Sequence, residues 1–210
     1  MKIHDISMLI EPEMMVYKDI PAKKPKLTNA ANHIENEYHE TKVELDIHCG
    51  THIDMPLHMI KNGKTMDSLD YRRLITDCKV FDMTKIGKNY ISADDINELE
   101  IENDDFVIFK TQNSYYDKTN GFDNEFVFVD ESAAKLLKSK KINGVGIDAL
   151  GIERSQPGHP THKLLLEDDI IIMEGLELKE VSEGEYKLIA LPIKIKGTEG
   201  SWVRAVLIEE

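Results

Sequence analysis

Three histidines and one aspartate lie within the segment HCGTHIDMPLH, which runs from His48 to His58. Imidazole nitrogens bind zinc, iron and similar ions, and a carboxylate can bridge two of them. A lone histidine is most often a surface or core residue, but four such side chains around a glycine favour a binding site. The segment therefore predicts a divalent-metal centre, with His48, His52 and Asp54 as candidate ligands.

The spacing within this segment requires a bend. A single helix is disfavoured because glycine, β-branched residues and proline interrupt it. A single straight strand would place His48 and Asp54 about 20 Å apart, too far for one ion. We therefore expect a strand that ends at His48, a sharp bend at residues 50–51, and a short extended piece. That piece carries His52 and Asp54 about 6.6 Å apart on one side.

A metal site of this kind commonly draws ligands from distant parts of the chain, and two candidates stand out. Glu174 ends the most hydrophobic run of the sequence, where an unpaired carboxylate is costly to bury; a surface glutamate at a strand end is the alternative. His162 begins a short helical segment after a turn, and His159 competes with it. The residues alone do not separate these two histidines.

The composition is that of an ordinary globular protein of 210 residues, with 41% hydrophobic and 31% charged side chains. This length suits one domain spanning residues 1–210. A net charge of -13 argues against nucleic acid as a partner, because a phosphate-binding surface needs clustered cations. No apolar run approaches the ~18 residues of a membrane helix, and the N-terminus does not resemble a secretory signal. We therefore expect no membrane partner and a cytoplasmic location.

Two cysteines, Cys49 and Cys78, are too few for a disulfide framework. Cys49 is adjacent to His48, and neighbouring side chains on a strand point to opposite faces. We expect Cys49 to be a small buried apolar residue, with a contact to the metal as the alternative.

Hydrophobic periodicity predicts strands alternating with a few helices, the pattern of an α/β protein with a mixed sheet. Residues 11–40 are polar and proline-containing, which predicts a long loop in which Tyr17 and Tyr38 could cover a substrate. The predicted strands are 2–8, 43–48, 78–84, 105–111, 144–148, 169–175, 186–195 and 202–208. The predicted helices are 92–99, 131–140 and 161–166.

The central segment resembles the HxGTHxDxPxH signature of the cyclase-like metal-dependent hydrolases, a family that includes bacterial kynurenine formamidases and isatin hydrolases. Further segments occur in the family's order along the chain: HDIS, VGID, HKLLL, a strand ending in glutamate, YKLIALPIK and GSWVRAVL. The resemblance implies a single mixed α/β domain of the swivelling β/β/α type, with a mixed β-sheet and flanking helices. It also implies a homodimer or homotetramer.

The resemblance further implies roles for individual residues. His48, His52 and Asp54 match the first set of metal ligands, with Asp54 bridging two ions. His162 and Glu174 match the second set, which favours His162 over His159. His58 matches the proton-transferring histidine, and a further ligand role is its alternative. The family's ion is zinc or manganese, which implies one or two ions per subunit.

These features together predict a hydrolase of a small amide, arylformamidase-like and of the N-formylkynurenine class, in tryptophan catabolism. Divalent ions lower the pKa of bound water from ~15.7 towards ~7 and polarise a carbonyl. The kynurenine formamidases carry a Trp-Pro-Gly segment where this chain reads VYKDIP, so Tyr17 becomes the candidate for substrate contact. The alternatives are a hydrolase of a cyclic amide, lactone or isatin-type ring, and a metal-binding protein without catalytic activity.

Overall fold

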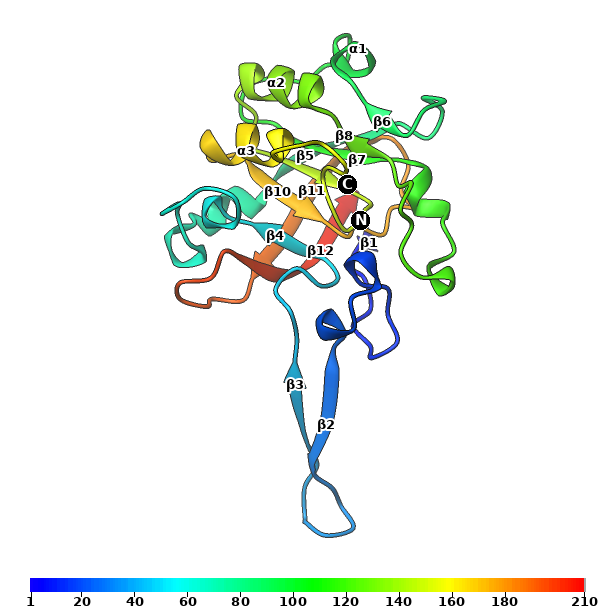
Figure 1. Cartoon of the computed structure of the whole chain (residues 1–210), viewed down its shortest axis with the longest axis vertical. Helices are drawn as coiled ribbons and strands as arrows, with labels where there is room; N and C mark the ends of the chain where they lie inside the picture. Colours follow the sequence, from blue (N-terminus) through cyan, green and yellow to red (C-terminus); the bar gives the residue numbers. More distant parts are fainter. Residues whose placement is uncertain (210) are drawn as a thin grey trace.

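The computed structural model describes residues 1–209, and its main sheet closes into a barrel (Figure 1). The strand order in this sheet is β1-β12-β11-β5-β7-β9-β10-β4, and an additional pairing of β4 with β12 closes the ring. The strands are β1 (Lys2–Asp5), β4 (His52–Asp54), β5 (Ile75–Asp82), β7 (Phe106–Lys110), β9 (Gly144–Ile147), β10 (Ile171–Glu174), β11 (Gly184–Pro192) and β12 (Gly200–Glu209).

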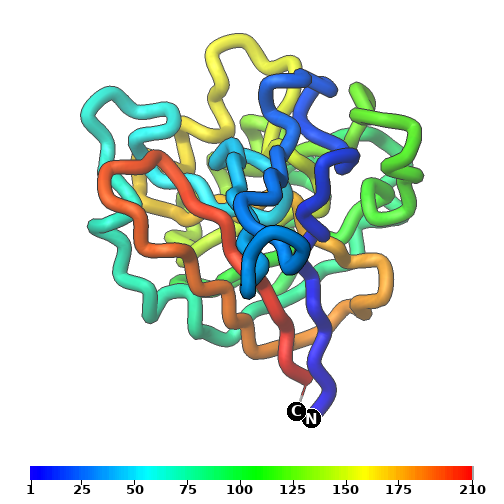
Figure 2. Tube along the Cα trace, turned by 90° about the horizontal axis from the view of Figure 1, so that it is seen from below, coloured from blue at the N-terminus to red at the C-terminus, as the bar shows by residue number. Residues whose placement is uncertain are grey.

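The sheet is mixed, as the sequence predicted. Strands β5, β7, β9 and β10 run parallel, and the pairings of β1, β4, β11 and β12 are antiparallel. Strand β12 pairs with β4 near its beginning and with β1 near its end. The first and last strands therefore lie side by side, with Lys2 paired with Glu209 (Figure 2). The sequence patterns did not predict closure of the sheet.

Alternation along the strands divides the apolar residues between two cores. Phe106, Ile108 and Met173 belong to the cluster inside the barrel. Val107 and Ile172, their neighbours in sequence, belong to the other cluster, which includes the helices. Because successive side chains of a strand point to opposite faces, a strand buried on both faces must be apolar throughout. This accounts for the continuous hydrophobic runs at β7 and β10.

The α-helices of residues 1–209 lie together on one side of the barrel (Figure 1). They are α1 (Ala93–Ile96), α2 (Glu131–Lys140) and α3 (Pro160–Glu167). Helix α2 has the predicted bounds, with Asp130 as its N-cap and a left-handed Lys141 at its end. Helix α1 begins after a capping box formed by Ser92 and Asp95, but it ends at Ile96 instead of continuing to the predicted residue 99. None of these helices is long and apolar enough to cross a membrane.

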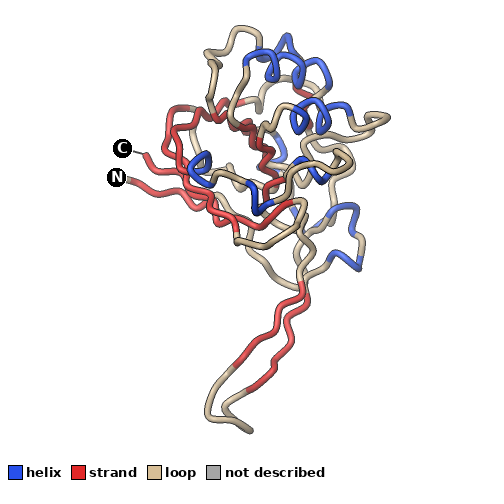
Figure 3. Tube along the Cα trace, turned by 90° about the vertical axis from the view of Figure 1, so that its left-hand side faces the viewer, coloured by secondary structure: helices blue, strands red, loops and turns tan. Residues whose placement is uncertain are grey.

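Residues 11–40 differ from the predicted long loop. Strands β2 (Lys26–Ala31) and β3 (Glu40–Glu44) form a hairpin that projects from the barrel, here named the arm (Figures 1 and 3). The arm is exposed over nearly its whole length, so it lacks the burial alternation by which a half-buried strand is recognised.

The predicted strand at 43–48 was wrong in its extent. Strand β3 ends at Glu44, and the chain then turns, because the Asp46 carboxylate accepts a hydrogen bond from the backbone N–H of His48 at 3.0 Å. Such a local side-chain contact favours a turn over a continued strand. His48 is therefore in a turn and not at a strand end.

Short elements complete the described chain. Strands β6 (Tyr90–Ile91) and β8 (Phe128–Val129) form a small parallel pair. The 3-10 helices are η1 (Tyr17–Asp19), η2 (Pro21–Lys23), η3 (Pro56–His58), η4 (Met66–Ser68), η5 (Tyr71–Leu74), η6 (Gln112–Tyr115) and η7 (Lys118–Asn120).

Candidate metal centre

The expected bend occurs at Gly50, and the expected short strand follows it as β4. Gly50 has a φ of +68°, and a Cβ at this position would lie 2.5 Å from the Ile10 side chain. The left-handed conformation favours glycine here, and a side chain would in addition have to displace the end of the Ile10 side chain. The Gly50 carbonyl lies 2.9 Å from His52 Nδ1, so it accepts the proton of that ring nitrogen and leaves Nε2 directed elsewhere.

The register of β4 against β10 brings the two distant halves of the candidate site together. His52 pairs directly with Glu174, and Ile53 pairs with Met173. Since Ile53 and Met173 lie in the barrel interior, His52, Asp54 and Glu174 point to the outer face. Gly175 adds a close backbone approach, because a Cβ there would lie 2.4 Å from the Gly50 carbonyl oxygen.

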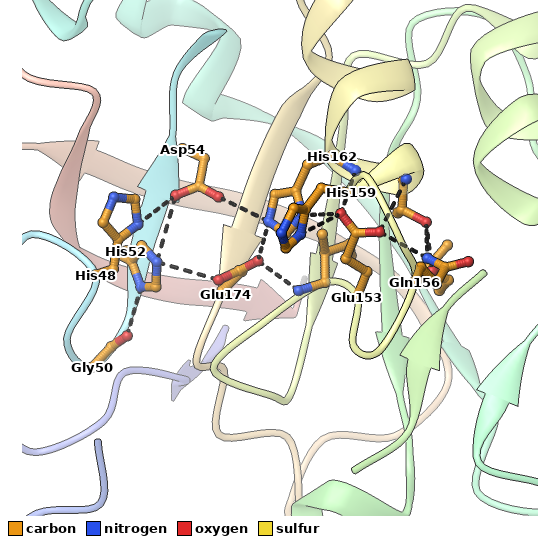
Figure 4. Close-up of polar contacts among 12 residues, drawn as sticks. His48, Gly50, His52, Asp54, Glu153, Gln156, His159, His162 and Glu174 are labelled. Carbon is orange, nitrogen blue, oxygen red and sulfur yellow. Dashed lines mark hydrogen bonds and ion pairs between the residues drawn. The ribbon is translucent and has the colours of Figure 1, made fainter. Parts of the chain in front are cut away.

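The ligand candidates converge on Asp54 and Glu174, as Figure 4 shows. Asp54 Oδ1 lies 3.0 Å from His48 Nδ1 and 3.6 Å from His52 Nε2. Asp54 Oδ2 lies 3.7 Å from His162 Nε2. Glu174 spans the same two sides, 3.3 Å from His52 Nε2 and 3.4 Å from His162 Nε2. The geometry therefore places one Asp54 oxygen towards each group of histidines, as a bridging carboxylate requires.

Several of these atoms are buried without a hydrogen bond. They are Asp54 Oδ1 and Oδ2, His48 Nε2 and His52 Nε2. Buried polar atoms in proteins are almost always paired, and an unpaired charge is especially costly. Nitrogen and oxygen donors of this kind suit zinc or manganese. The residues therefore fit a divalent cation.

Three groups of side chains bring their ligand atoms within 4.8 Å of one another: His48–Asp54–His58, His52–Asp54–Glu174 and Glu153–His159–His162. Asp54 belongs to two of these groups. Each group could hold a metal ion, and Asp54 is the residue that the first two groups share.

In this cluster the carboxylates raise the pKa values of two histidines, and those histidines lower the pKa of Glu174. Burial opposes the charged form of each histidine, but Glu174 and Asp54 raise the pKa of His52 to about 9. Burial likewise opposes ionisation of His162, but Glu153, Glu174 and Asp54 raise its pKa to about 10. Burial also disfavours the Glu174 carboxylate, but His162 and His52 hold its pKa well below the usual range. Without metal, the cluster therefore holds protons on His52 and His162.

His58 lies beside the cluster, on η3. Its ring centroid is 4.1 Å from that of His48 and 5.6 Å from that of His162. Burial lowers the pKa of His58, so it is the cluster histidine that burial keeps neutral. The geometry accommodates both roles considered for His58, proton transfer and a further ligand.

The structure separates His162 from its competitor. The His162 side chain is 7% exposed and faces Asp54 and Glu174, whereas the His159 side chain is 59% exposed. Cys49 is buried with its sulfur 3.6 Å from that of Met14, and burial raises the pKa of its thiol to about 11. Cys49 is thus a neutral core residue that belongs to none of the ligand groups found within residues 1–209.

The sequence reasoning missed Glu153, which is buried and contacts His162. Glu153 begins the polar segment ERSQPGHP, which resembles a surface loop. The sequence reasoning also missed Glu199, whose carboxylate lies 3.4 Å from His48 Nε2. The signal that identifies both residues is tertiary contact.

A cavity of about 580 Å³ opens onto His48, His58, His162 and Glu174. Tyr17 lies in its wall, as expected for a residue that covers a substrate. The ring of Tyr17 is 5.0 Å from that of Phe122, and Phe122 is 5.7 Å from Phe126. The cluster of ligands therefore lies at one side of a cavity that has an aromatic wall.

The fold and the site define a mixed α/β barrel protein with a candidate metal centre on the outer face of the barrel. Residues 4–154 match the family model described as "Putative cyclase", and the chain belongs to that family. This confirms the family resemblance stated from the sequence.

Individual proteins show the same similarity along the whole chain. A solved structure described as a potential metal-dependent hydrolase with cyclase activity is 46% identical, with a TM-score of 0.91, and the match covers 98% of this chain and 96% of that one. An isatin hydrolase bound to the product analogue thioisatinate is 25% identical, with a TM-score of 0.86, over 100% and 93% of the two chains. The kynurenine formamidase of Salinibacter ruber is 29% identical over 99% of this chain and 97% of its own length.

Proposed function

We propose that this protein is a metal-dependent hydrolase that cleaves the carbon–nitrogen bond of a small amide, in the manner of an arylformamidase acting on the N-formylkynurenine class. One observation carries the proposal: both oxygens of the buried Asp54 lack hydrogen bonds, and they lie between histidines beside a cavity. Similarity to a kynurenine formamidase and to a potential metal-dependent hydrolase supports it.

Five residues would hold one or two zinc or manganese ions: His48, His52, Asp54, His162 and Glu174. When bound, such ions act as Lewis acids and lower the pKa of water from ~15.7 towards ~7. Glu174 is held in place for this role, because one oxygen accepts a hydrogen bond from the backbone N–H of Ile152 at 2.6 Å. The protein contributes carboxylates whose pKa values the neighbouring histidines lower in spite of burial, so both are ionised at neutral pH.

The remaining residues would bind the substrate and move a proton. Tyr17, Phe122 and Phe126 would pack against an aromatic or other planar ring, since aromatic side chains favour offset or edge contacts with such groups. His58 is neutral and open to the cavity, so it can accept a proton and donate it to the leaving nitrogen.

The test is hydrolysis by protein loaded with zinc or manganese, using N-formylkynurenine, formanilide and isatin as substrates. We expect turnover of a formyl amide, and its loss together with metal content in His52→Ala and Glu174→Ala. Full activity of a metal-free sample would contradict the proposal. Folding of both variants is checked by circular dichroism, so that loss of activity is separated from loss of structure.

The second candidate is a hydrolase of a cyclic amide, lactone or isatin-type ring. The observation that favours it is Tyr17, which stands where the formamidases carry tryptophan in a Trp-Pro-Gly segment, together with structural similarity to an isatin hydrolase. Turnover of isatin without turnover of any formyl amide would replace the first proposal with this one. A metal-binding protein without catalysis is the remaining alternative, and the adjoining cavity argues against it because a purely structural site is normally closed.

We also propose that the protein assembles as a homodimer or homotetramer. The arm supports this, because a lone two-stranded hairpin is marginally stable in water and gains from contact with a second chain. Leu27 and Val43 pair across the arm and are 46% and 53% exposed. Light scattering on the intact chain and on a variant with the arm replaced by a short Gly-Ser linker tests the assembly. A cytoplasmic location, and the lack of nucleic-acid and membrane partners, stay predictions.

A further inference from the structure

The polar contacts of Glu153 are with residues at the N-terminus of α3 and in the loop just before it. Its Oε1 is 2.5 Å from His162 Nδ1 and 3.2 Å from the backbone nitrogen of His162. Its Oε2 accepts hydrogen bonds from the backbone nitrogen of Thr161 at 3.2 Å and from Gln156 Nε2 at 2.8 Å. Glu153 is 4% exposed, so these contacts replace water (Figure 4).

Glu153 takes over capping from the residue that precedes the helix. His159 is the N-cap of α3, but it has a left-handed backbone and its side chain makes no capping hydrogen bond. The first N–H groups of a helix need acceptors, and a carboxylate is favoured there by the helix dipole. Glu153 supplies that acceptor from a separate segment of the chain and so holds the beginning of α3 in place.

The same carboxylate determines which nitrogen of His162 faces the cluster. A carboxylate oxygen only accepts hydrogen bonds, so Nδ1 of His162 must carry the proton that it shares with Glu153. In a neutral ring this leaves the lone pair on Nε2, and Nε2 is the nitrogen that faces Glu174 and Asp54. Ring orientation and tautomer are therefore set by one contact.

We propose that Glu153 is a positioning residue that holds the ring and the tautomer of His162 for metal binding, while it also caps α3. This inference rests on the proposed metal centre. Partners of this kind, behind a metal ligand, typically change metal affinity by about 10- to 100-fold when they are removed. A helix cap alone would change folding stability and leave the metal affinity of the folded protein unchanged.

The experiment compares Glu153→Gln and Glu153→Ala with a matched control, Asp130→Ala. Asp130 caps α2 by accepting a hydrogen bond from the backbone N–H of Ala133 at 2.9 Å, so its loss removes a cap without touching His162. Zinc affinity is measured by competition with a chromophoric chelator, and thermal unfolding is followed on the metal-free proteins.

We expect both Glu153 variants to bind zinc about 10- to 100-fold more weakly than the wild type. Asp130→Ala should unfold at a lower temperature and bind zinc as the wild type does. In the zinc-loaded wild type, the His162 Nδ1–H proton should give a resolved NMR signal coupled to nitrogen, which Glu153→Ala loses and Asp130→Ala keeps. Glu153→Gln retains the shape of the side chain, so zinc affinity and the His162 signal are measured on this variant if Glu153→Ala fails to fold.

Zinc affinity of folded Glu153→Gln within twofold of the wild type, with an unchanged His162 signal, would overturn the inference. The failure of the proposed function gives a different result. A wild-type protein that binds no zinc would remove the metal centre itself, whereas one that binds zinc but hydrolyses none of the substrates would leave the role of Glu153 intact.

Discussion

Asp54 and Asp148 are both buried carboxylates, 1% and 5% exposed, and their surroundings are opposite in kind. Asp148 accepts hydrogen bonds from the backbone and hydroxyl groups of Thr111 at 2.8 and 2.7 Å, and from those of Ser114 at 3.0 and 2.5 Å. Asn113 adds a further donor at 3.3 Å. Neither oxygen of Asp54 makes a hydrogen bond.

This difference separates a structural carboxylate from one that we propose to be a metal ligand. Groups of the polypeptide donate hydrogen bonds to both oxygens of Asp148, and these bonds hold the segment after β7 to the end of β9. Asp54 receives no such hydrogen bonds and is surrounded by histidines. Since buried polar atoms are almost always hydrogen-bonded, the two Asp54 oxygens without a hydrogen bond fit the metal ion that we propose for this site.

The largest expected effect is the loss of metal binding in Asp54→Asn. The change keeps the shape of the side chain and removes the charge that both groups of histidines face. We expect metal affinity to fall by more than the about 100-fold that loss of an indirect partner causes, and hydrolysis to fall with it. Metal analysis and the hydrolysis assay check this, and Asp148→Asn is the control that should retain its metal. Wild-type metal content in Asp54→Asn would remove the distinction between the two aspartates.

The second effect is an exchange of protons for metal at the Asp54 cluster. Metal binding needs neutral imidazoles, but the pKa values of about 9 for His52 and about 10 for His162 keep both rings protonated near pH 7 without metal. We expect zinc binding to release protons and to weaken by up to about 100-fold for each pH unit of acidification below about pH 9, tenfold for each proton. Calorimetry in two buffers of different ionisation enthalpy measures the protons released. A heat independent of the buffer would contradict the assigned protonation.

The third effect is on folding. In Asp148→Ala the backbone and hydroxyl donors of Thr111 and Ser114 lose their acceptor inside the protein. We expect the free energy of unfolding to fall by about 3 kcal/mol or more, since each buried unsatisfied group costs about 1–3 kcal/mol. Urea denaturation of the metal-free protein measures this change. We expect a smaller loss for Asp54→Asn, because Asp54 accepts no hydrogen bond and the protonated histidines around it keep Glu174 as a second carboxylate partner. A similar loss in both variants would show that the two sites are equivalent.

The smallest effect is a pH dependence of stability that arises from Asp148. Burial raises its pKa above the usual value of 3.8, and the hydrogen bonds from Ser114 and Thr111 offset this only in part. A raised carboxyl pKa means that the folded state binds the proton more tightly than the unfolded state does. The stability contribution is therefore complete below pH 3.8 and declines as the pH rises through the folded-state value. The difference in unfolding free energy between wild type and Asp148→Asn, measured from pH 3 to 8, should show this decline; a rise over the same range would contradict it.

Much of the fold was predictable where a local pattern coincided with burial. Helix α2 was predicted with its observed bounds because its apolar residues form one stripe along the helix, and the structure adds Asp130 as its N-cap. Strands β7 and β10 were predicted because continuous apolar runs are typical of strands covered on both faces. The arm was missed because its strands are exposed on both faces over nearly their whole length. Their sequences therefore lack the alternation of apolar and polar residues that identifies a half-buried strand.

The candidate site was predictable to a similar degree. The ligand types and the bend at Gly50 follow from the residues and from their order in the motif. The choice of His162 over His159 came from family resemblance, and the structure places His162 at the cluster. Glu153 and Glu199 could not be found in this way, since a carboxylate in a polar loop looks the same in sequence whether it is solvated or faces a histidine.

The sequence by itself determined the donor chemistry of this protein: imidazoles and carboxylates around a glycine bend, and a glutamate at the end of an apolar strand. Only the tertiary structure decided that these donors meet. The antiparallel register of β4 and β10 pairs His52 with Glu174, and closure of the barrel through β4 and β12 fixes β4 in that position. The physical reason is that register and closure depend on packing of side chains far apart in sequence, such as Ile53 and Met173, which no local pattern records.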